Sequence, residues 1–167
     1  VAPLKHRQFR SLLVFCLTWV VGVMSADPFY SVFMIRDLQV SYATIGVLNA
    51  VVLAVGILGY QFWGGVVERF GGKPVLQLLM IPRFAMPLIW VLLTPRNHGI
   101  VLPAIMVTNG LVFSGLTVAV NTLLFGSVPA GSEAAVFFAT WAFTNSLVNS
   151  GATAIGGILA RLVGDAT

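Results

Sequence analysis

Charged side chains are scarce in this sequence of 167 residues, where aspartate, glutamate, lysine and arginine together make up 8%. Soluble domains carry about 25% charged residues, so this chain lacks the polar surface that a water-soluble domain needs. Hydrophobic residues make up 58% of the chain, and the mean hydropathy is +0.97. The scarcity of charge therefore excludes an ordinary soluble domain and favours a protein that lies in a lipid bilayer.

Cysteine and histidine are also scarce, with one cysteine, Cys16, and two histidines, His6 and His98. A disulfide framework and a Cys/His zinc site both need more of these residues than the chain has. Cys16 lies in an apolar run, so we expect a small packed side chain. We find no paired nucleophile and base, so we expect no metal, no cofactor and no enzyme.

The basic residues do not form a nucleic-acid patch, although the formal net charge is +4. They stand singly or in small groups at the ends of apolar runs, as the loop charges that orient a membrane protein do. We therefore expect a lipid bilayer as partner and no nucleic acid.

Long apolar runs, in contrast, are frequent. About 18 or more apolar residues in a row indicate a helix that crosses the hydrocarbon. The sequence predicts an all-α integral membrane protein with a single membrane domain over 1–167. Its five transmembrane helices are expected at about 12–35, 45–67, 75–93, 100–127 and 133–163. Ser41 or Thr44 suits the N-cap of the second helix, and Ser132 with Glu133 suits the start of the fifth.

The loop charges predict an orientation. One side of the membrane would carry Lys5, Arg7, Arg10, Arg69 and Lys73, and the other side Arg36, Arg96 and Arg161. Because the more basic side is usually cytoplasmic, we expect the N-terminus of this piece to be cytoplasmic, in the plasma (inner) membrane.

We expect the chain to be a fragment, because it starts at Val1 rather than methionine and ends at Thr167 just after an apolar run. The basic and then apolar start is similar to a signal peptide. However, the apolar run continues past Asp27, and bulky Met24 stands two residues before the best cleavage point. We therefore expect no cleavage, and we expect the missing remainder of the polypeptide to be a partner.

Charge and glycine gather in the stretch WGGVVERFGGKP between the second and third predicted spans. Its glycines permit close helix approach and turns with positive φ. Glu68 ends the second span, where it can accept hydrogen bonds from Arg69, from Lys73 or from a helix N-terminus.

The spacing of Gly64, Glu68, Arg69, Gly71 and Lys73 resembles the signature loop of the major facilitator superfamily. That pattern, G-x-x-x-D/E-R/K-x-G-R/K-R/K, joins the second and third helices of each six-helix half. The one departure is Gly72, where the family usually has a basic residue, which weakens the charge network of the loop. The resemblance implies a cytoplasmic gate at this loop; the alternative is a solvated loop whose charges only set the topology.

The resemblance covers nearly the whole chain and implies five helices of a partial six-helix bundle. The fourth span carries no arginine in its first half, where N-terminal halves of many members have one, so we expect the C-terminal half. The resemblance also implies a secondary active transporter that moves a small solute by alternating access, with proton coupling.

Two charged residues are predicted within spans. Asp27 is expected roughly 12 Å deep at ~1.5 Å per residue, where an acid costs about 2.5–3.5 kcal/mol on insertion scales. It could carry a proton, contact a cationic substrate, or mark a kink beside Pro28. Arg83 could form an intramembrane charge pair with Asp27, snorkel, make a structural pair elsewhere, or contact the substrate.

Polar residues recur at helical spacing in the fourth and fifth spans, which places each set on one helix face. The first set is Gly110, Ser114, Thr117 and Asn121; the second is Trp141, Asn145 and Asn149, with Thr153 next. The resemblance implies that both faces line a cavity, and helix packing is the alternative for both. Trp63 and Trp90 are expected to anchor at the membrane interface.

Two other classes of function stay open. A membrane scaffold, receptor or assembly subunit could use the same bundle, and changes that lock the gate at Gly71 would then leave its activity untouched. A membrane enzyme is disfavoured by the poor catalytic set.

Overall fold

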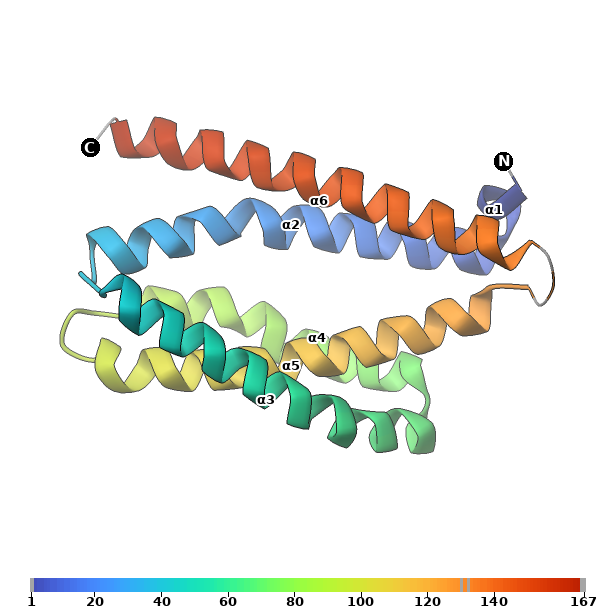
Figure 1. Ribbon diagram of the computed structural model, residues 1–167, viewed down its shortest axis with the longest axis horizontal. Helices are drawn as coiled ribbons and strands as arrows, with labels where there is room; N and C mark the ends of the chain where they lie inside the picture. The colour runs from blue at the N-terminus through green and yellow to red at the C-terminus, as the bar shows by residue number, and fades with distance from the viewer. Residues whose placement is uncertain (1, 130, 132, 166–167) are drawn as a thin grey trace. The chain divides into compact units, whose positions relative to one another are not determined.

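The computed structural model describes residues 2–129, 131 and 133–165, and in these residues it is all-helical, as predicted. Figure 1 shows the helices, which are α1 (Ala2–Lys5), α2 (Arg7–Arg36), α3 (Tyr42–Phe70), α4 (Gly72–Val91), α5 (His98–Ser127) and α6 (Ala134–Asp165). Each long helix contains all or nearly all of one predicted apolar span. The predicted cap residue Ser132 lies outside the described residues.

Four helices in the described part are long and apolar enough to cross a membrane: α2, α3, α4 and α5. Helix α6 is not among them. The fold class is therefore confirmed as an all-α protein with membrane-spanning helices, and the fifth span stays a prediction.

Local chemistry sets the helix ends. Ser41 is the N-cap of α3, as predicted, and its hydroxyl accepts a hydrogen bond from the Thr44 backbone N–H at 3.1 Å. Between α4 and α5, the Asn97 side chain accepts from the Thr94 backbone N–H at 2.8 Å and donates to the Leu92 carbonyl at 3.0 Å. These bonds satisfy backbone groups that helix ends leave unpaired.

The chain divides into two compact units. Unit 1 holds residues up to Met34 and from Leu124 onward, and unit 2 holds Ile35–Leu123. Each unit is described separately below. The single membrane domain over 1–167 stays a prediction.

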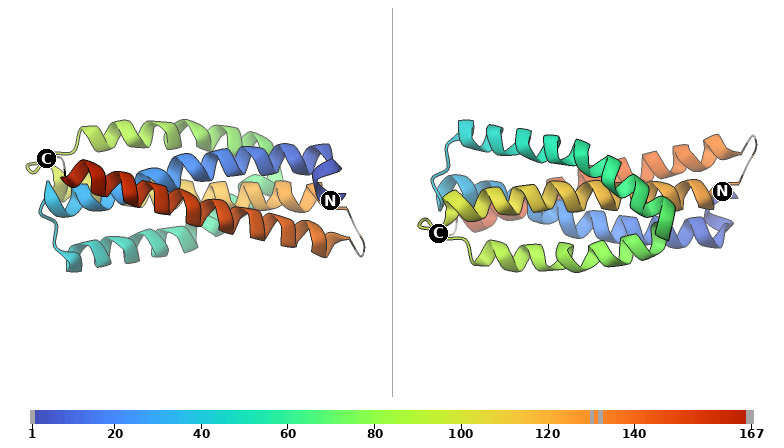
Figure 2. Two further views of the ribbon diagram at one scale, coloured as in Figure 1. Left: turned by 90° about the horizontal axis from the view of Figure 1, so that it is seen from above. Right: turned by 90° about the horizontal axis from the view of Figure 1, so that it is seen from below.

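Unit 1 is built on α2 and α6, which lie side by side in Figures 1 and 2. Near the start of both helices, the rings of Phe9 and Phe137 pack edge to face with centroids 5.0 Å apart. Further along both, a Cβ added at Gly156 would meet the Ser25 carbonyl oxygen at 2.5 Å. Contacts that advance together along both helices show that α2 and α6 run parallel. Three helices separate them in sequence, so parallel packing agrees with strictly alternating helix directions.

Unit 2 packs α3 and α4 against α5. Contacts advance together along α3 and α5, from Val52 with Gly110 to Trp63 with Gly115. Along α4 and α5 they run in opposite directions, because Gly72 meets Ala119 while Arg83, further along α4, meets Asn109. Helix α5 is therefore parallel to α3 and antiparallel to α4, which is the order that alternating spans require.

Two predictions about single residues can be judged from burial. Cys16 is buried, as expected for a small packed side chain. The expected interface anchor at Trp63 is wrong. The residue is 9% exposed, and its Nε1–H donates to the Leu111 carbonyl of α5 at 2.9 Å. Its indole therefore joins two helices within unit 2 instead of facing lipid headgroups.

Candidate functional site

The predicted gate loop is shorter in the structure than the sequence suggests. Helix α3 continues to Phe70 and α4 starts at Gly72, so Gly71 alone separates them. Gly71 has φ 85° and ψ 156°, a combination that is essentially restricted to glycine. Gly64, Glu68 and Arg69 of the predicted loop therefore lie in the last turns of α3, and Lys73 lies in the first turn of α4.

The charged residues at this turn are exposed. Glu68, Arg69 and Lys73 all face outward, and no ion pair joins them within the described residues. Arg69 has its guanidinium 5.5 Å from the centroid of the Phe70 ring. The structure thus presents the charges on the surface of unit 2, where they are accessible to another part of the protein.

Gly72 departs from the resembled pattern for a physical reason. It is buried, and a Cβ there would lie 2.9 Å from the Ala119 carbonyl oxygen and 3.2 Å from a Leu123 side-chain carbon. Because Ala119 contributes backbone, it cannot move aside cheaply. A lysine or arginine at this position would force α4 away from α5, so the sequence keeps glycine where the family usually has a basic residue.

The first half of the α5 stripe packs against α3. A Cβ at Gly110 would lie 2.8 Å from the Val52 carbonyl oxygen, and one at Gly59 would lie 2.2 Å from the Ser114 Oγ. Ser114 is 1% exposed, and its hydroxyl donates to the Leu111 carbonyl at 2.8 Å. At Gly110 and Ser114 the packing alternative therefore holds, and neither residue faces a cavity.

The second half of the α5 stripe is more open. Thr117 is half-buried, and its hydroxyl donates to the Phe113 carbonyl of its own helix at 2.9 Å. Asn121, one helical turn further, is exposed. Asn121 remains a candidate for the solute route.

The α6 stripe keeps its amides accessible. Trp141 is half-buried and packs its ring 6.4 Å from that of Phe9. Asn145 is half-buried and donates from Nδ2 to the Trp141 carbonyl at 3.0 Å, while Asn149 is exposed. Gly156, on the same helix face, is buried against Ser25. The two ends of this face pack against α2, at Trp141 and at Gly156, and Asn149 between them is exposed within unit 1.

Asp27 lies in the C-terminal half of α2 and is exposed. Helix α2 runs through the Asp27–Pro28 step without interruption. Proline removes one backbone donor at this point, and the helix continues through it. The exposed carboxylate in a helix that can cross a membrane is consistent with a place beside water or beside another part of the protein.

Arg83 makes a contact that the sequence did not reveal. Its Nη1 donates to the Asn109 Oδ1 at 2.6 Å, joining α4 to α5 within unit 2. Both side chains are half-buried. Asp27 belongs to unit 1 and Arg83 to unit 2, so the predicted pair of these two residues stays a prediction.

Asn109 was missed because it precedes the predicted stripe by one residue and so lies on a different face of α5. One signal could have found it. Asn109 is an amide inside a helix that can cross a membrane, where an amide needs a hydrogen-bond partner. The intramembrane arginine in the preceding helix is the obvious donor.

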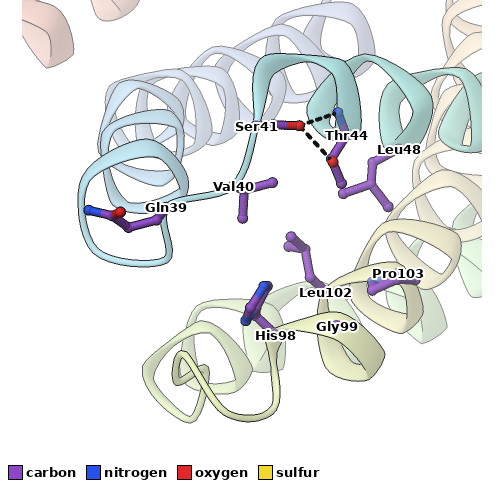
Figure 3. Close-up of a pocket in the computed structure, with 9 residues that line it drawn as sticks. All are labelled: Gln39, Val40, Ser41, Thr44, Leu48, His98, Gly99, Leu102 and Pro103. Atoms are coloured by element: carbon purple, nitrogen blue, oxygen red, sulfur yellow. Dashed lines mark hydrogen bonds between the residues drawn. The ribbon is translucent and has the colours of Figure 1, made fainter.

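A small cavity lies at the other end of unit 2 from the Gly71 turn, and Figure 3 shows it. Its volume is about 240 Å³, and its lining residues are Gln39, Val40, Ser41, Thr44, Leu48, His98, Gly99, Leu102 and Pro103. The Ser41 hydroxyl already bonds both the backbone and the side chain of Thr44. His98 Nδ1 lies 2.9 Å from the Pro95 carbonyl. The polar groups that line the cavity therefore mainly cap α3 and hold the turn before α5.

Comparison with known proteins gives one distant relative. The chain is 24% identical over 178 aligned positions to autophagy-related protein 22-1 of the fungus Neosartorya fischeri. The alignment covers 96% of this chain and 29% of that protein, so the chain spans less than a third of its relative. No family model matches the chain, and no solved structure matches it. At this identity and coverage the similarity assigns neither a family nor an activity to the chain.

Proposed function

We propose that this chain is part of a secondary active transporter that moves a small solute across a membrane by alternating access, coupled to protons. The observation that carries the proposal is the presence of charge in helices that can cross a membrane. Asp27 lies in α2 and Arg83 in α4, and both helices meet the length and apolarity that a span needs. Charges at such positions are expensive and usually serve a route or a relay.

The proposed route is lined by Asp27, Asn121, Trp141, Asn145 and Asn149. All are exposed or half-buried in their own unit, which a route requires. The Gly71 turn, with Gly64, Glu68, Arg69 and Lys73, would act as the cytoplasmic gate. Its exposed charges can form and break contacts with another part of the protein as the access side changes.

The distant similarity to autophagy-related protein 22-1 supports a transporter-like membrane protein over nearly the whole length of this chain. Because the chain spans 29% of that relative, transport would need the remainder of the polypeptide. The lipid bilayer and a small solute with protons are the other partners. The proposal includes no catalysis and no nucleic acid.

The proposed location is the plasma (inner) membrane, with the N-terminus and the Gly71 turn in the cytoplasm. The basic residues Lys5, Arg7, Arg10, Arg69 and Lys73 support this orientation, since cytoplasmic loops carry the excess of lysine and arginine. Fluorescent-protein fusions to the full-length protein would distinguish the plasma membrane from an internal one.

The test uses the full-length protein in liposomes that enclose a pH-sensitive dye. Sugars, amino acids, organic acids and amines are added outside under a proton gradient, and solute-dependent proton movement is followed. We expect at least one class to move protons with the wild type. Asp27→Asn should abolish this movement, because an amide cannot release a proton, while Asp37→Asn in the exposed turn after α2 should retain it.

Two outcomes would contradict the proposal. If no solute class crosses the membrane with the wild type, the scaffold or receptor alternative takes its place. If Asp27→Asn transports with an unchanged dependence on pH, Asp27 does not carry the coupling proton.

A further inference from the structure

The start of α2 and the residues just before it carry a group of cations with no acid among them. Lys5, Arg7 and Arg10 stand close together in the sequence, and the first acid of the chain is Asp27. All three cationic side chains are exposed, and no ion pair or hydrogen bond holds them within the part of the chain that the structure describes. Glu133, just before α6, is also exposed and forms no ion pair with them there. This end of unit 1 therefore presents positive charge that the described residues leave uncompensated.

Packing against α6 fixes the position of these cations. Phe9 is completely buried, and its ring packs edge to face on that of Phe137. The His6 ring also lies edge-on to Phe137, with centroids 6.0 Å apart. The Arg10 backbone N–H donates to the His6 carbonyl at 2.9 Å, which joins this segment to the first turn of α2. Since His6 and Phe9 are both anchored on α6, the arginine beside each of them, Arg7 and Arg10, is held at the end of unit 1.

One face of α2 continues from these cations into exposed apolar residues. Arg7, Arg10 and Val14 follow one another at spacings of three and four, so they share this face, and Val21 continues it. Val14 is 57% exposed and Val21 is 48% exposed. Thr18 lies on the same face, and its hydroxyl donates to the Val14 carbonyl at 2.9 Å. This face of α2 is thus cationic at its end and apolar along its length.

The length of this face matches one leaflet of a bilayer. Helix α2 is long and apolar enough to cross a membrane. From Arg10 to Val21 the helix rises roughly 16 Å at ~1.5 Å per residue. The hydrocarbon core of a bilayer is about 30 Å thick, so one leaflet contributes about 15 Å. With the arginines at the level of the lipid headgroups, the apolar part of the face lies along the acyl chains of the same leaflet.

We propose that Arg7 and Arg10 bind the phosphate headgroup of an anionic glycerophospholipid, whose acyl chains lie along Val14 and Val21. Guanidinium groups match phosphate oxygens with paired hydrogen bonds. The start of a helix also favours an anion, because its backbone N–H groups and its dipole point toward it. Loop charges that only orient the protein need to lie near this end, but they need not share a face with exposed apolar residues. The inference goes beyond the proposed transport function and does not depend on it.

The test titrates dioleoyl phosphatidylglycerol into the full-length protein in a neutral detergent and follows the melting temperature. Dioleoyl phosphatidylcholine has the same chains without the net charge and is the matched probe. We expect phosphatidylglycerol to raise the melting temperature more than phosphatidylcholine does. The difference should shrink at a salt concentration of about 1 M, where the screening length falls to about 3 Å.

Arg10→Gln is the main variant, because it removes one charge from this face and leaves the buried face of α2 untouched. We expect the apparent affinity for phosphatidylglycerol to fall roughly fivefold, the contribution of about one cation beside an anionic lipid surface. The melting temperature without lipid should stay the same. Arg7→Gln should behave in the same way and gives a second reading if Arg10→Gln folds poorly. Arg96→Gln, in the exposed turn between α4 and α5, removes the same charge and should keep the wild-type response.

Several results would overturn the inference. Equal responses of the wild type to the two lipids would mean that another part of the protein, rather than an anionic lipid, covers this face. Equal losses in Arg10→Gln and Arg96→Gln would mean that only the net charge of the protein matters. An equal rise with glycerol 3-phosphate, a soluble headgroup without chains, would indicate a site for free phosphate. Full selectivity for phosphatidylglycerol in both Arg7→Gln and Arg10→Gln would place the lipid elsewhere.

Discussion

The seam between α3 and α5 in unit 2 and the amide face of α6 in unit 1 have similar sequence patterns and different structures. Both place polar or small residues at spacings of three and four on one helix face. In the seam, Gly110 and Ser114 are buried against Val52 and Gly59. On α6, Asn145 is half-buried and Asn149 is exposed.

The difference teaches that the size of the side chain, rather than its polarity, decides which part of such a face packs. Glycine and serine let two helix backbones approach closely, and serine can satisfy its hydroxyl on its own helix. An amide has two donors and an acceptor, and Asn145 places one donor on the Trp141 carbonyl. The remaining groups need water, another helix or a solute. Amides within such a face are therefore better candidates for a transport route than glycines and serines.

The largest expected effect comes from enlarging the seam. Gly110→Leu would drive a side chain into the Val52 carbonyl, 2.8 Å from the position of the new Cβ. We expect a loss of about 3 kcal/mol, because overpacking against backbone cannot be relieved by a rotamer change. Asn149→Leu, on the exposed amide face, should change stability by less than about 0.5 kcal/mol.

Thermal unfolding of both variants in matched detergent measures this contrast. Equal losses of stability in Gly110→Leu and Asn149→Leu would show that the amide face is packed as tightly as the seam.

A smaller effect on stability is expected within the predicted gate, where a side chain is strained at Gly71 and tolerated at Gly64. Gly71 has φ 85°, so Gly71→Ala should be strained by about 1–3 kcal/mol. Gly64 lies inside α3, and a Cβ there would meet nothing within 4 Å, so Gly64→Ala should be neutral or stabilising.

Unfolding and transport of the full-length variants check this prediction together. In a transporter gated at this turn, Gly71→Ala lowers the rate of solute movement and Gly64→Ala does not. If Gly71→Ala loses stability but keeps its full rate, the turn sets only the topology of the chain.

Much of the fold could be predicted because apolar runs of membrane length leave the backbone few alternatives to helices. The cap at Ser41 followed from local chemistry in the same way. The one-residue turn at Gly71 was not predicted, because Glu68, Arg69 and Lys73 look like loop residues until helix ends are placed. The contact of Trp63 depends on which face of α5 meets a neighbour, and a single sequence does not contain that information.

The candidate site was predicted less well than the fold, for a related reason. A polar residue in a membrane helix needs a partner, but the partner can be solute, water or another helix. The Ser114 hydroxyl donates to a carbonyl of its own helix, and the Arg83 guanidinium donates to Asn109. Gly110 allows α5 to pack closely against α3. Only the three-dimensional neighbours distinguish these cases.

The central claim is that the amide face of α6 lines a solute route while the seam does not. Single cysteines in the full-length protein test it directly after Cys16 and any other native cysteines are replaced. Asn149→Cys is compared with Ser114→Cys, using a membrane-impermeant thiol reagent in native membranes. The account predicts that the cysteine at position 149 is labelled, that a transported solute protects it, and that the cysteine at 114 stays unlabelled. Absence of labelling at 149, or equal labelling at both positions, would contradict it.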